Sequence, residues 1–270
     1  MADPPEPDQA AVELRTDIAH PARVYDYWLG GKENFPADRA AAEAVIAELP
    51  DMPLIARENR AFLRRGVRFL AAEAGIRQFL DFGSGLPTQG NVHEIAQQVT
   101  PTARILYVDN DPIVLAHGRA LLASSTTEVI QADLREPATI LDHPTTRRLL
   151  NLDRPVGVLL SAILHHLRAE EDPAGIVACL RDAVAPGSYV LISHGTADFN
   201  TEAATRAAAR FAQARTAMPY VNRSRAEIAR FFEGWELVDP GLVQAPYWRP
   251  DGPLPDYADR ITTYAGIGRK

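Results

Sequence analysis

The sequence is poor in lysine, and its charge balance is acidic. Lysine occurs only at Lys32 and Lys270, so arginine supplies nearly all the positive charge. The formal net charge is −7 and the sequence pI is about 5.5. A general nucleic-acid binder normally carries a strong basic patch, which this composition does not favour. We therefore expect no nucleic-acid partner.

The sequence also has little cysteine and no long apolar run. The single cysteine, Cys179, excludes an intramolecular disulfide and a cysteine-based zinc cluster, and we expect no metal. No segment reaches the ~18 consecutive apolar residues of a transmembrane helix, so we expect no membrane partner. The beginning of the chain, MADPPEPDQAAVELR, is acidic and proline-rich, unlike a secretory signal. These features together predict a cytoplasmic protein.

The pattern of apolar residues divides the chain into three parts. Residues 1–15 combine prolines with acidic residues and contain no aromatics, which predicts disorder. Residues 16–75 are typical of a helical N-terminal extension. Residues 76–270 alternate short strand-like runs with helical segments, and this alternation favours a parallel sheet with helices on both faces.

Seven strand-like segments are expected in residues 76–270, and a helical insertion at about 196–225 follows the fifth of them. Their sequences are IRQFLDF, RILYVDN, EVIQADL, PVGVLLSAI, SYVLISHG, WELVDPGLV and RITTYAGIGR. No helix separates the last two segments, so we expect the final strand to run antiparallel to its neighbour. The insertion is a candidate substrate cover, and its arginines favour an anionic acceptor.

A glycine loop, Gly83-Ser84-Gly85, follows the first strand. Ligands of open α/β sheets bind at the carboxyl ends of the strands, so this loop is the predicted cofactor site. The dinucleotide fingerprint G-x-G-x-x-G leads directly into a helix. Here the third glycine is missing and Pro87 removes an amide donor. A capping box at Asn91–Glu94 also delays the helix. The loop fits a dinucleotide poorly.

An acidic residue lies at or after the end of each of the first three strands. Asp81 would repel a pyrophosphate but suits the ammonium group of a methionine moiety. Asp109, 24 residues after Gly85, would accept hydrogen bonds from both ribose hydroxyls, with Asn110 beside it. Asp133 would accept from the adenine amino group, with Leu134 flanking the ring. Together these acids favour S-adenosylmethionine, although a loop-capping role for Asp81 and a turn role for Asp133 remain open.

Several longer segments carry a resemblance to a known family. They are HPARVYDYWLGGKENFPADR, ARENRAFLRR, FLDFGSGLPTQGNVHE, YVDNDPIVLAHGRALL, SAILHHL and the C-terminal WELVDPGLV…YAGIGRK. In these segments the chain resembles the Rossmann-like class I S-adenosylmethionine-dependent methyltransferases. More narrowly, it is similar to an actinobacterial S-adenosyl methyltransferase family formerly known as a domain of unknown function. The resemblance implies an α/β fold with a seven-stranded, mostly parallel sheet whose last strand is antiparallel. It names no methyl acceptor.

The end of the fourth strand is the predicted catalytic region. It would place Ser161 beside the cofactor, with His165 and His166 just beyond. The chain has no Asn/Asp-Pro-Pro-Tyr motif there, which disfavours methylation of a DNA base or an amide nitrogen. A histidine can deprotonate an acceptor hydroxyl or ring nitrogen. Alternatively, one histidine packs and the other caps the next helix, since methyl transfer requires positioning more than a base.

The aromatic, glycine-rich segment VYDYWLGGKENF is a candidate lid over the cofactor. In this hypothesis Tyr25 or Trp28 lies near the sulfonium, and Gly30-Gly31 forms a hinge. The alternative is an aromatic staple that holds the N-terminal helices together. Arg60 can reach the methionine carboxylate, or it can pair with Glu58.

The sequence therefore predicts a methyltransferase that transfers a methyl group from S-adenosylmethionine to a small molecule. The predicted cofactor-binding residues are Asp81, Gly83, Ser84, Gly85, Asp109, Asn110, Asp133, Leu134, Ser161, Tyr25 and Arg60. The predicted catalytic residues are His165 and His166. The alternatives are an NAD(P)-dependent oxidoreductase and a non-catalytic S-adenosylmethionine-binding protein, and the oligomeric state stays open.

Overall fold

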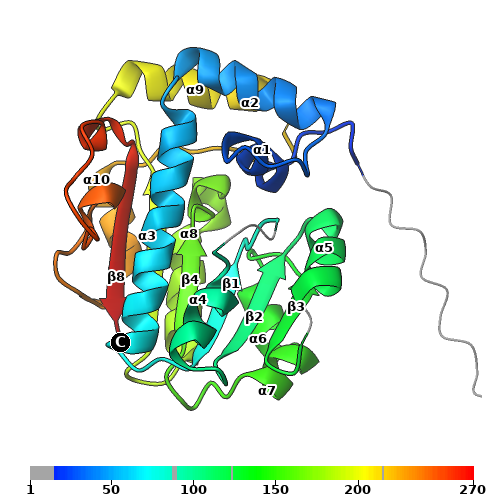
Figure 1. The fold of residues 1–270 in the computed structure, drawn as a ribbon, viewed down its shortest axis with the longest axis vertical. Helices are drawn as coiled ribbons and strands as arrows, with labels where there is room; N and C mark the ends of the chain where they lie inside the picture. Colours follow the sequence, from blue (N-terminus) through cyan, green and yellow to red (C-terminus); the bar gives the residue numbers. More distant parts are fainter. Residues whose placement is uncertain (1–14, 87–89, 123, 215) are drawn as a thin grey trace, which may run out of the picture.

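A mixed β-sheet forms the centre of the computed structural model, which describes residues 15–86, 90–122, 124–214 and 216–270 (Figure 1). Apart from Arg15, the segment predicted to be disordered lies outside these ranges, and so does Pro87. The sheet order is β3-β2-β1-β4-β5-β8-β6, with β7 also paired to β8. The strands are β1 Gln78–Phe82, β2 Arg104–Asp109, β3 Thr127–Gln131, β4 Gly157–Ser161, β5 Tyr189–Gly195, β6 Glu236–Leu237, β7 Val243–Gln244 and β8 Thr263–Arg269.

The predicted fold class is confirmed, and one strand differs from its predicted form. Strands β1 to β5 are parallel to their neighbours, and β8 runs antiparallel to β5 as expected. The segment predicted as a single sixth strand instead forms β6 and β7, two short strands that both pair with β8. Pro240 lies between them and has no N–H to continue the ladder. The described sheet therefore has eight strands rather than seven.

Ten α-helices surround the sheet in the described residues. They are α1 Pro21–Trp28, α2 Pro36–Glu48, α3 Met52–Ala72, α4 Val92–Val99, α5 Pro112–Leu122, α6 Pro137–Asp142, α7 Pro144–Leu149, α8 Pro173–Ala183, α9 Thr201–Gln213 and α10 Arg225–Ala229. Many begin at a proline, whose missing N–H and preset φ suit the first helical position. Helix α4 begins at Val92, as its capping box predicts. The short helices α6 and α7 were not predicted.

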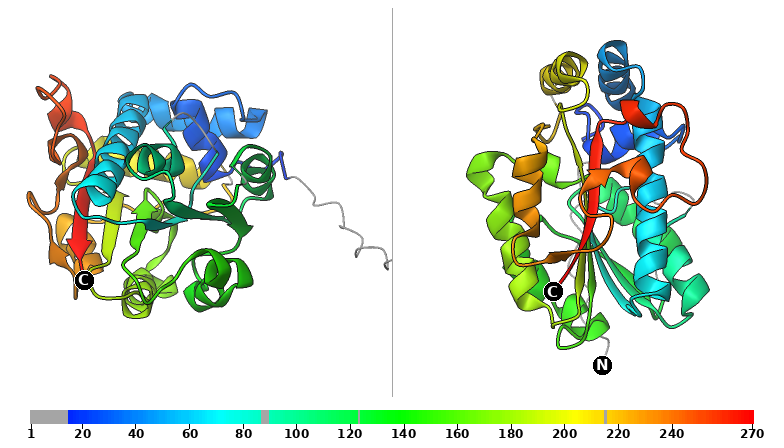
Figure 2. Two further views of the ribbon diagram at one scale, coloured as in Figure 1. Left: turned by 60° about the horizontal axis from the view of Figure 1, so that its bottom comes forward. Right: turned by 90° about the vertical axis from the view of Figure 1, so that its left-hand side faces the viewer.

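Helices cover both faces of the sheet (Figure 2), and a hydrophobic core lies on each face. Neighbouring strand residues point to opposite faces, so Phe79 joins the core under α3 and α4 while Leu80 joins the core under α8 and α10. Helix α3 comes close to β5 at Gly66, where a Cβ would lie 2.3 Å from Leu191 Cδ1. The strands read as nearly continuous apolar runs because both faces are covered.

Helices α1, α2 and α9 form a cap across the carboxyl ends of the parallel strands (Figures 1 and 2). Helices α2 and α9 lie side by side, and Glu48 of α2 binds Arg206 and Arg210 of α9 at 2.9 and 3.0 Å. The segment after α9 also meets the residues just before α1, because Ala217 N–H donates to Ala19 O at 2.8 Å. The N-terminal helices and the insertion after β5 therefore meet over the sheet edge.

A buried ion cluster holds α1 in this cap. The Arg23 guanidinium binds Asp38 of α2 at 3.0 Å and Asp111, in the loop after β2, at 3.2 Å. All three side chains are at most 3% exposed. Burial of a charge is costly unless it is paired and hydrogen-bonded, so each carboxylate depends on the arginine and the arginine on both of them.

We expect Asp38→Ala to lower the free energy of unfolding by about 3–5 kcal/mol, because it leaves the buried Arg23 with only one of its two carboxylate partners. Urea denaturation followed by circular dichroism measures this change. The matched control is Asp142→Ala, which removes an exposed partner of Arg147 and should change stability by no more than about 0.5 kcal/mol. Equal stability of the two variants would show that the buried cluster contributes nothing.

Candidate active site

A cavity opens between the cap and the carboxyl ends of β1, β2 and β4. Counted with its open mouth and the solvent there, it spans about 1460 Å³. Every candidate site residue from the sequence lines it: Tyr25, Arg60, Asp81, Gly83, Ser84, Gly85, Asp109, Asn110, Asp133, Leu134, Ser161, His165 and His166. This is the edge of the sheet at which open α/β folds bind their ligands.

The glycine loop after β1 has a backbone that only glycine adopts easily. Gly83 and Gly85 have φ values of +66° and +65°, in the left-handed region. A Cβ at Gly83 would lie 2.5 Å from Ile163 Cδ1, so this position also lacks space for a side chain. The two glycines therefore bring the loop backbone close to the cavity. Leu86, where the methyltransferase class favours glycine, is buried against Ile113 and Val114 instead.

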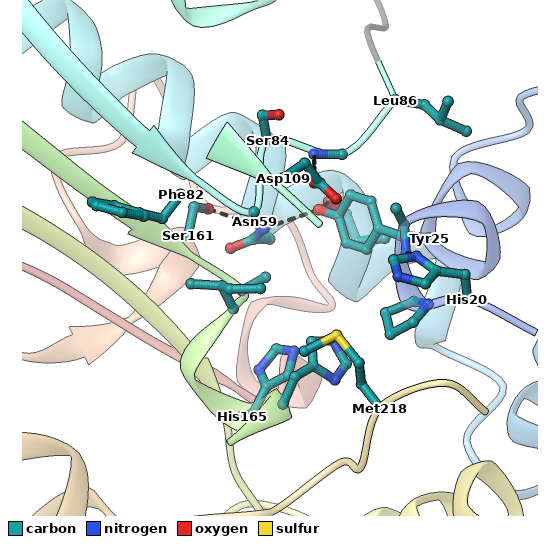
Figure 3. A pocket seen from close by; sticks show the side chains of 18 of the residues that line it. His20, Tyr25, Asn59, Phe82, Ser84, Leu86, Asp109, Ser161, His165 and Met218 are labelled. Atoms are coloured by element: carbon teal, nitrogen blue, oxygen red, sulfur yellow. Dashed lines mark hydrogen bonds between the residues drawn. The ribbon is translucent and has the colours of Figure 1, made fainter. Parts of the chain in front are cut away.

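Asp109 connects this loop to the end of β2. One oxygen of the Asp109 carboxylate (Figure 3) accepts from Gly85 N–H at 2.9 Å. The other oxygen accepts from Asp111 N–H at 2.9 Å. Burial raises the pKa of the Asp109 carboxyl, which these backbone donors partly offset. Each oxygen keeps a further lone pair that a ribose hydroxyl can use.

Asp133, after β3, is held by Arg135 of its own turn. The guanidinium binds both carboxylate oxygens, at 2.5 and 2.9 Å. This pairing lowers the pKa of Asp133 and keeps it anionic. Asp133 thus has the turn role that the sequence left open, and it still lines the cavity beside Leu134.

Asp81 is a buried carboxyl at the end of β1. Burial raises the pKa of this carboxyl to about 7, and the positive charge of Arg60 offsets part of the rise. No described residue donates a hydrogen bond to it, so the loop-capping alternative has no support among these residues. Arg60 donates to Gly90 O at 3.2 Å, whereas Glu58 accepts from the Tyr257 hydroxyl at 3.0 Å. The carboxyl of Asp81 and the guanidinium of Arg60 therefore both lie at this end of the cavity.

A group of hydrogen-bonded side chains at the cavity wall links α1 and α3 to the sheet. Its central member is Asn59, which the sequence analysis missed. The Asn59 amide donates to the Tyr25 hydroxyl at 2.9 Å and to Ser161 at 3.4 Å (Figure 3). Its oxygen accepts from Ser193, which also binds Ser161 at 3.2 Å. Ala162 follows with φ +54°, an uncommon backbone for a residue with a side chain.

The aromatic segment of the N-terminal extension forms α1 and a tight turn. Tyr25 and Trp28 both line the cavity, and Trp28 also donates to Ala42 O at 3.3 Å, so the segment both lines the cavity and staples the helices. The turn wraps around the buried Asp26, and a Cβ at Gly31 would lie 1.9 Å from its carboxylate. This close packing argues for a fixed turn at Gly30-Gly31 rather than the predicted hinge.

His165 and His166 lie in a short 3-10 helix, η1 Leu164–His166, directly after β4. Both are buried, and their ring centroids are 4.4 Å apart. Burial lowers the pKa of His166 to about 4, and the pKa of His165 also falls well below its usual value. Both rings are therefore neutral at physiological pH.

The part of the cavity wall contributed by α1, α3, α9 and the segment after α9 is mainly apolar. It includes Trp28, Leu29, Met52, Ile55, Phe211 and Met218, of which the sequence had singled out only Trp28. The predicted preference for an anionic acceptor is not supported, because none of the four described arginines of the insertion lines the cavity. Arg206 and Arg210 bind Glu48 and Arg225 donates to Leu242 O, while Arg223 caps η1. Arg215 lies outside the described residues.

Among the described residues, no group of three or more histidines, cysteines or acidic residues is placed to hold a metal ion. No described helix is both long and apolar enough to cross a membrane.

The sheet order, the glycine loop after β1 and the acidic residues after the first three strands together define a class I methyltransferase fold. A family model described as S-adenosyl methyltransferase matches residues 7–270, and the chain belongs to this family. S-adenosylmethionine is its cofactor, and the protein is an S-adenosylmethionine-dependent methyltransferase. The NAD(P)-dependent oxidoreductase and the non-catalytic binding protein are set aside.

Solved structures agree with this assignment. A protein of the DUF574 family from Streptomyces avermitilis is 46% identical, with a TM-score of 0.91 over 95% of this chain and 99% of its own. A protein from Thermobifida fusca, provisionally described as a methyltransferase, is also 46% identical, with a TM-score of 0.89 over 95% of this chain and 97% of its own. An O-methyltransferase family protein from Burkholderia thailandensis, 16% identical, shares the fold with a TM-score of 0.52 over 91% of this chain and 63% of its own. No match was found among curated proteins.

We expect the buried histidines to make the protein less stable as the pH falls from about 6.5 to about 4. In this window the unfolded chain binds a proton at His166 that the folded chain excludes, since burial lowers the folded pKa to about 4. The loss from this residue is on the order of 3 kcal/mol at the acid end. Melting temperatures measured at half-unit pH steps test this, with His166→Gln giving a flatter curve. An unchanged slope in the variant would contradict the assignment.

Proposed function

We propose that the protein transfers the methyl group of S-adenosylmethionine to an uncharged small molecule held against the apolar wall of the cavity. The observation that carries this proposal is the distribution of charge. Asp81, Asp109 and Asp133 lie at the strand ends by the glycine loop, whereas Met52, Ile55 and Phe211 line the cap side. A charged acceptor would lose its hydration against such a wall without gaining an ionic partner.

The cofactor contacts follow from the same distribution. We assign the ribose to Asp109, the adenine to Asp133, Leu134 and Asn110, and the methionine ammonium and carboxylate to Asp81 and Arg60. An ammonium beside Asp81 favours the ionised form of this carboxyl, whose pKa burial raises to about 7. The backbone of Gly83, Ser84 and Gly85 lies along the cofactor, with Ser161 and Tyr25 facing the sulfonium.

The reaction needs little from the protein beyond alignment. S-adenosylmethionine carries an activated methyl group, and the acceptor attacks it in line with the breaking S–C bond. The protein contributes by holding the two molecules in contact and excluding water. We assign the covering role to the extension of residues 16–75 together with the insertion at about 196–225, over a catalytic domain of residues 76–270. The buried contacts of Arg23 support this division of roles.

The acidic, lysine-poor composition supports two further assignments, a cytoplasmic location and the absence of a nucleic-acid partner.

Calorimetric titration with S-adenosylmethionine, and in parallel with NAD and NADP, tests the cofactor contacts. We expect binding of S-adenosylmethionine alone, and Asp109→Ala should weaken it by about one to two orders of magnitude, because a charge-assisted hydrogen bond contributes roughly 1.5–3 kcal/mol. Asp142→Ala, far from the cavity, is the matched control. Undiminished affinity in Asp109→Ala would remove this residue from the site, and binding of NAD would refute the proposal.

A further inference from the structure

His165 and His166 are neighbours in the chain, yet backbone contacts hold them in opposite tautomers. Nδ1 of His165 accepts a hydrogen bond from Gly195 N–H at 3.3 Å. Nδ1 of His166 lies 2.7 Å from Pro219 O, and because a carbonyl only accepts, this nitrogen carries the proton. In its neutral form His165 therefore has its proton on Nε2, whereas His166 has a free lone pair on Nε2.

A second pair of buried residues holds this arrangement from behind. Arg223, 8% exposed, donates to Leu164 O at 2.9 Å and to Leu167 O at 2.7 Å, on either side of the histidine pair. The same guanidinium approaches His194 Nε2 at 3.0 Å. Nδ1 of His194 then donates to Gly195 O at 2.6 Å, on the residue whose N–H binds His165. Arg223 is thus a positioning residue for both rings.

Neither Nε2 atom of His165 and His166 is sealed from solvent. Both histidines line the cavity, and neither Nε2 has a hydrogen-bond partner among the described residues. In the described part of the chain, two polar side-chain atoms are sealed from solvent and have no hydrogen-bond partner: the indole nitrogens of Trp235 and Trp248. The histidine Nε2 atoms are not among them. The Nε2 atoms of both histidines are therefore open to a ligand. Tyr220, 4.5 Å from His165 between ring centroids, adds an aromatic face beside them.

We propose that the methyl acceptor is a planar aromatic molecule with oxygens on two adjacent ring atoms, at least one of them a hydroxyl. The hydroxyl that is methylated donates its hydrogen bond to His166 Nε2, and the neighbouring oxygen accepts one from His165 Nε2–H. The imidazole rings of His165 and His166 are neighbours, so their donor and acceptor match two oxygens on adjacent atoms of the methyl acceptor. They do not match two oxygens on opposite sides of the methyl acceptor's ring system. This inference rests on the proposed function of the cavity and adds the chemical class of its acceptor.

The reaction then balances with the groups present. The hydroxyl oxygen attacks the methyl carbon, the new O–C bond forms and the S–C bond breaks with its electron pair moving to sulfur. The products are the aryl methyl ether and S-adenosylhomocysteine. As the O–C bond forms, the hydroxyl proton becomes far more acidic than an imidazolium, so it passes to His166 Nε2 despite the lowered pKa of this ring, and from there to solvent. His165 keeps its proton throughout and holds the second oxygen.

Two isomers with the same atoms and the same apolar surface test the acceptor class. They are 2,3-dihydroxynaphthalene, with adjacent hydroxyls, and 2,7-dihydroxynaphthalene, with separated hydroxyls. In calorimetric titrations of the full-length protein saturated with S-adenosylhomocysteine, we expect the 2,3 isomer to bind at least about tenfold more tightly, since an unmet donor or acceptor in a built site is penalised. With S-adenosylmethionine, only the 2,3 isomer should give a monomethyl ether. Equal affinities, or no binding of either isomer, would overturn the proposal.

Variants separate the roles of the residues. His166→Gln, whose amide can still donate to Pro219 O, should lower kcat by about 100-fold or more with little change in KM. Arg223→Lys should reduce the preference for the 2,3 isomer, whereas Arg206→Lys, on the outer surface of α9, should keep it. Full kcat in His166→Gln would overturn its role as base. Titration with S-adenosylmethionine alone, without acceptor, reports on the proposed cofactor contacts, so their failure is distinguishable from failure of this proposal.

Discussion

The cavity depends first on the buried ion cluster of Arg23, Asp38 and Asp111. Its arginine belongs to α1, and its two carboxylates belong to α2 and to the loop after β2. Asp111 also donates its backbone N–H to Asp109, which in turn binds Gly85 in the glycine loop. One set of buried contacts therefore connects the cap to the cofactor end of the sheet. Since each charge is nearly inaccessible to water, none of these elements can separate without exposing an unpaired charge.

A second constraint is the arrangement of polarity inside the cavity. Carboxylates occupy the ends of β1, β2 and β3, where they suit a cofactor with hydroxyl, amino and ammonium groups. The cap and the segment after β4 contribute aliphatic and aromatic side chains and two neutral histidines. Polar contacts made in such surroundings are stronger than in water, so a few directional hydrogen bonds are enough to orient an acceptor. The charged groups that suit the cofactor therefore lie on one side of the cavity, and the apolar side chains that surround the acceptor lie on the other.

Much of the cofactor half was predictable from sequence because it is a local pattern repeated along the chain. An apolar strand followed by an acid or a glycine loop places its ligand group at the strand's carboxyl end, and parallel strands bring these ends together. Asp81, Asp109 and Asp133 were found in this way. Asn59 was not, although it lies in the segment ARENRAFLRR. Tyr220 and Arg223 were noted only as members of the insertion, and the sequence did not show which groups they contact. The roles of these three residues arise from partners 102, 55 and 59 residues away along the chain.

By itself, the sequence determined the class of sheet, its antiparallel last strand, the glycine loop and the family. These properties follow from hydrophobic periodicity and from short motifs, which act over a few residues. Tertiary structure alone decided that the N-terminal helices and the insertion meet as a cap, that the insertion's arginines face away from the cavity and that two adjacent histidines take opposite tautomers. Each of these depends on which distant backbone group or charge comes within hydrogen-bonding distance, and only the folded chain sets that distance.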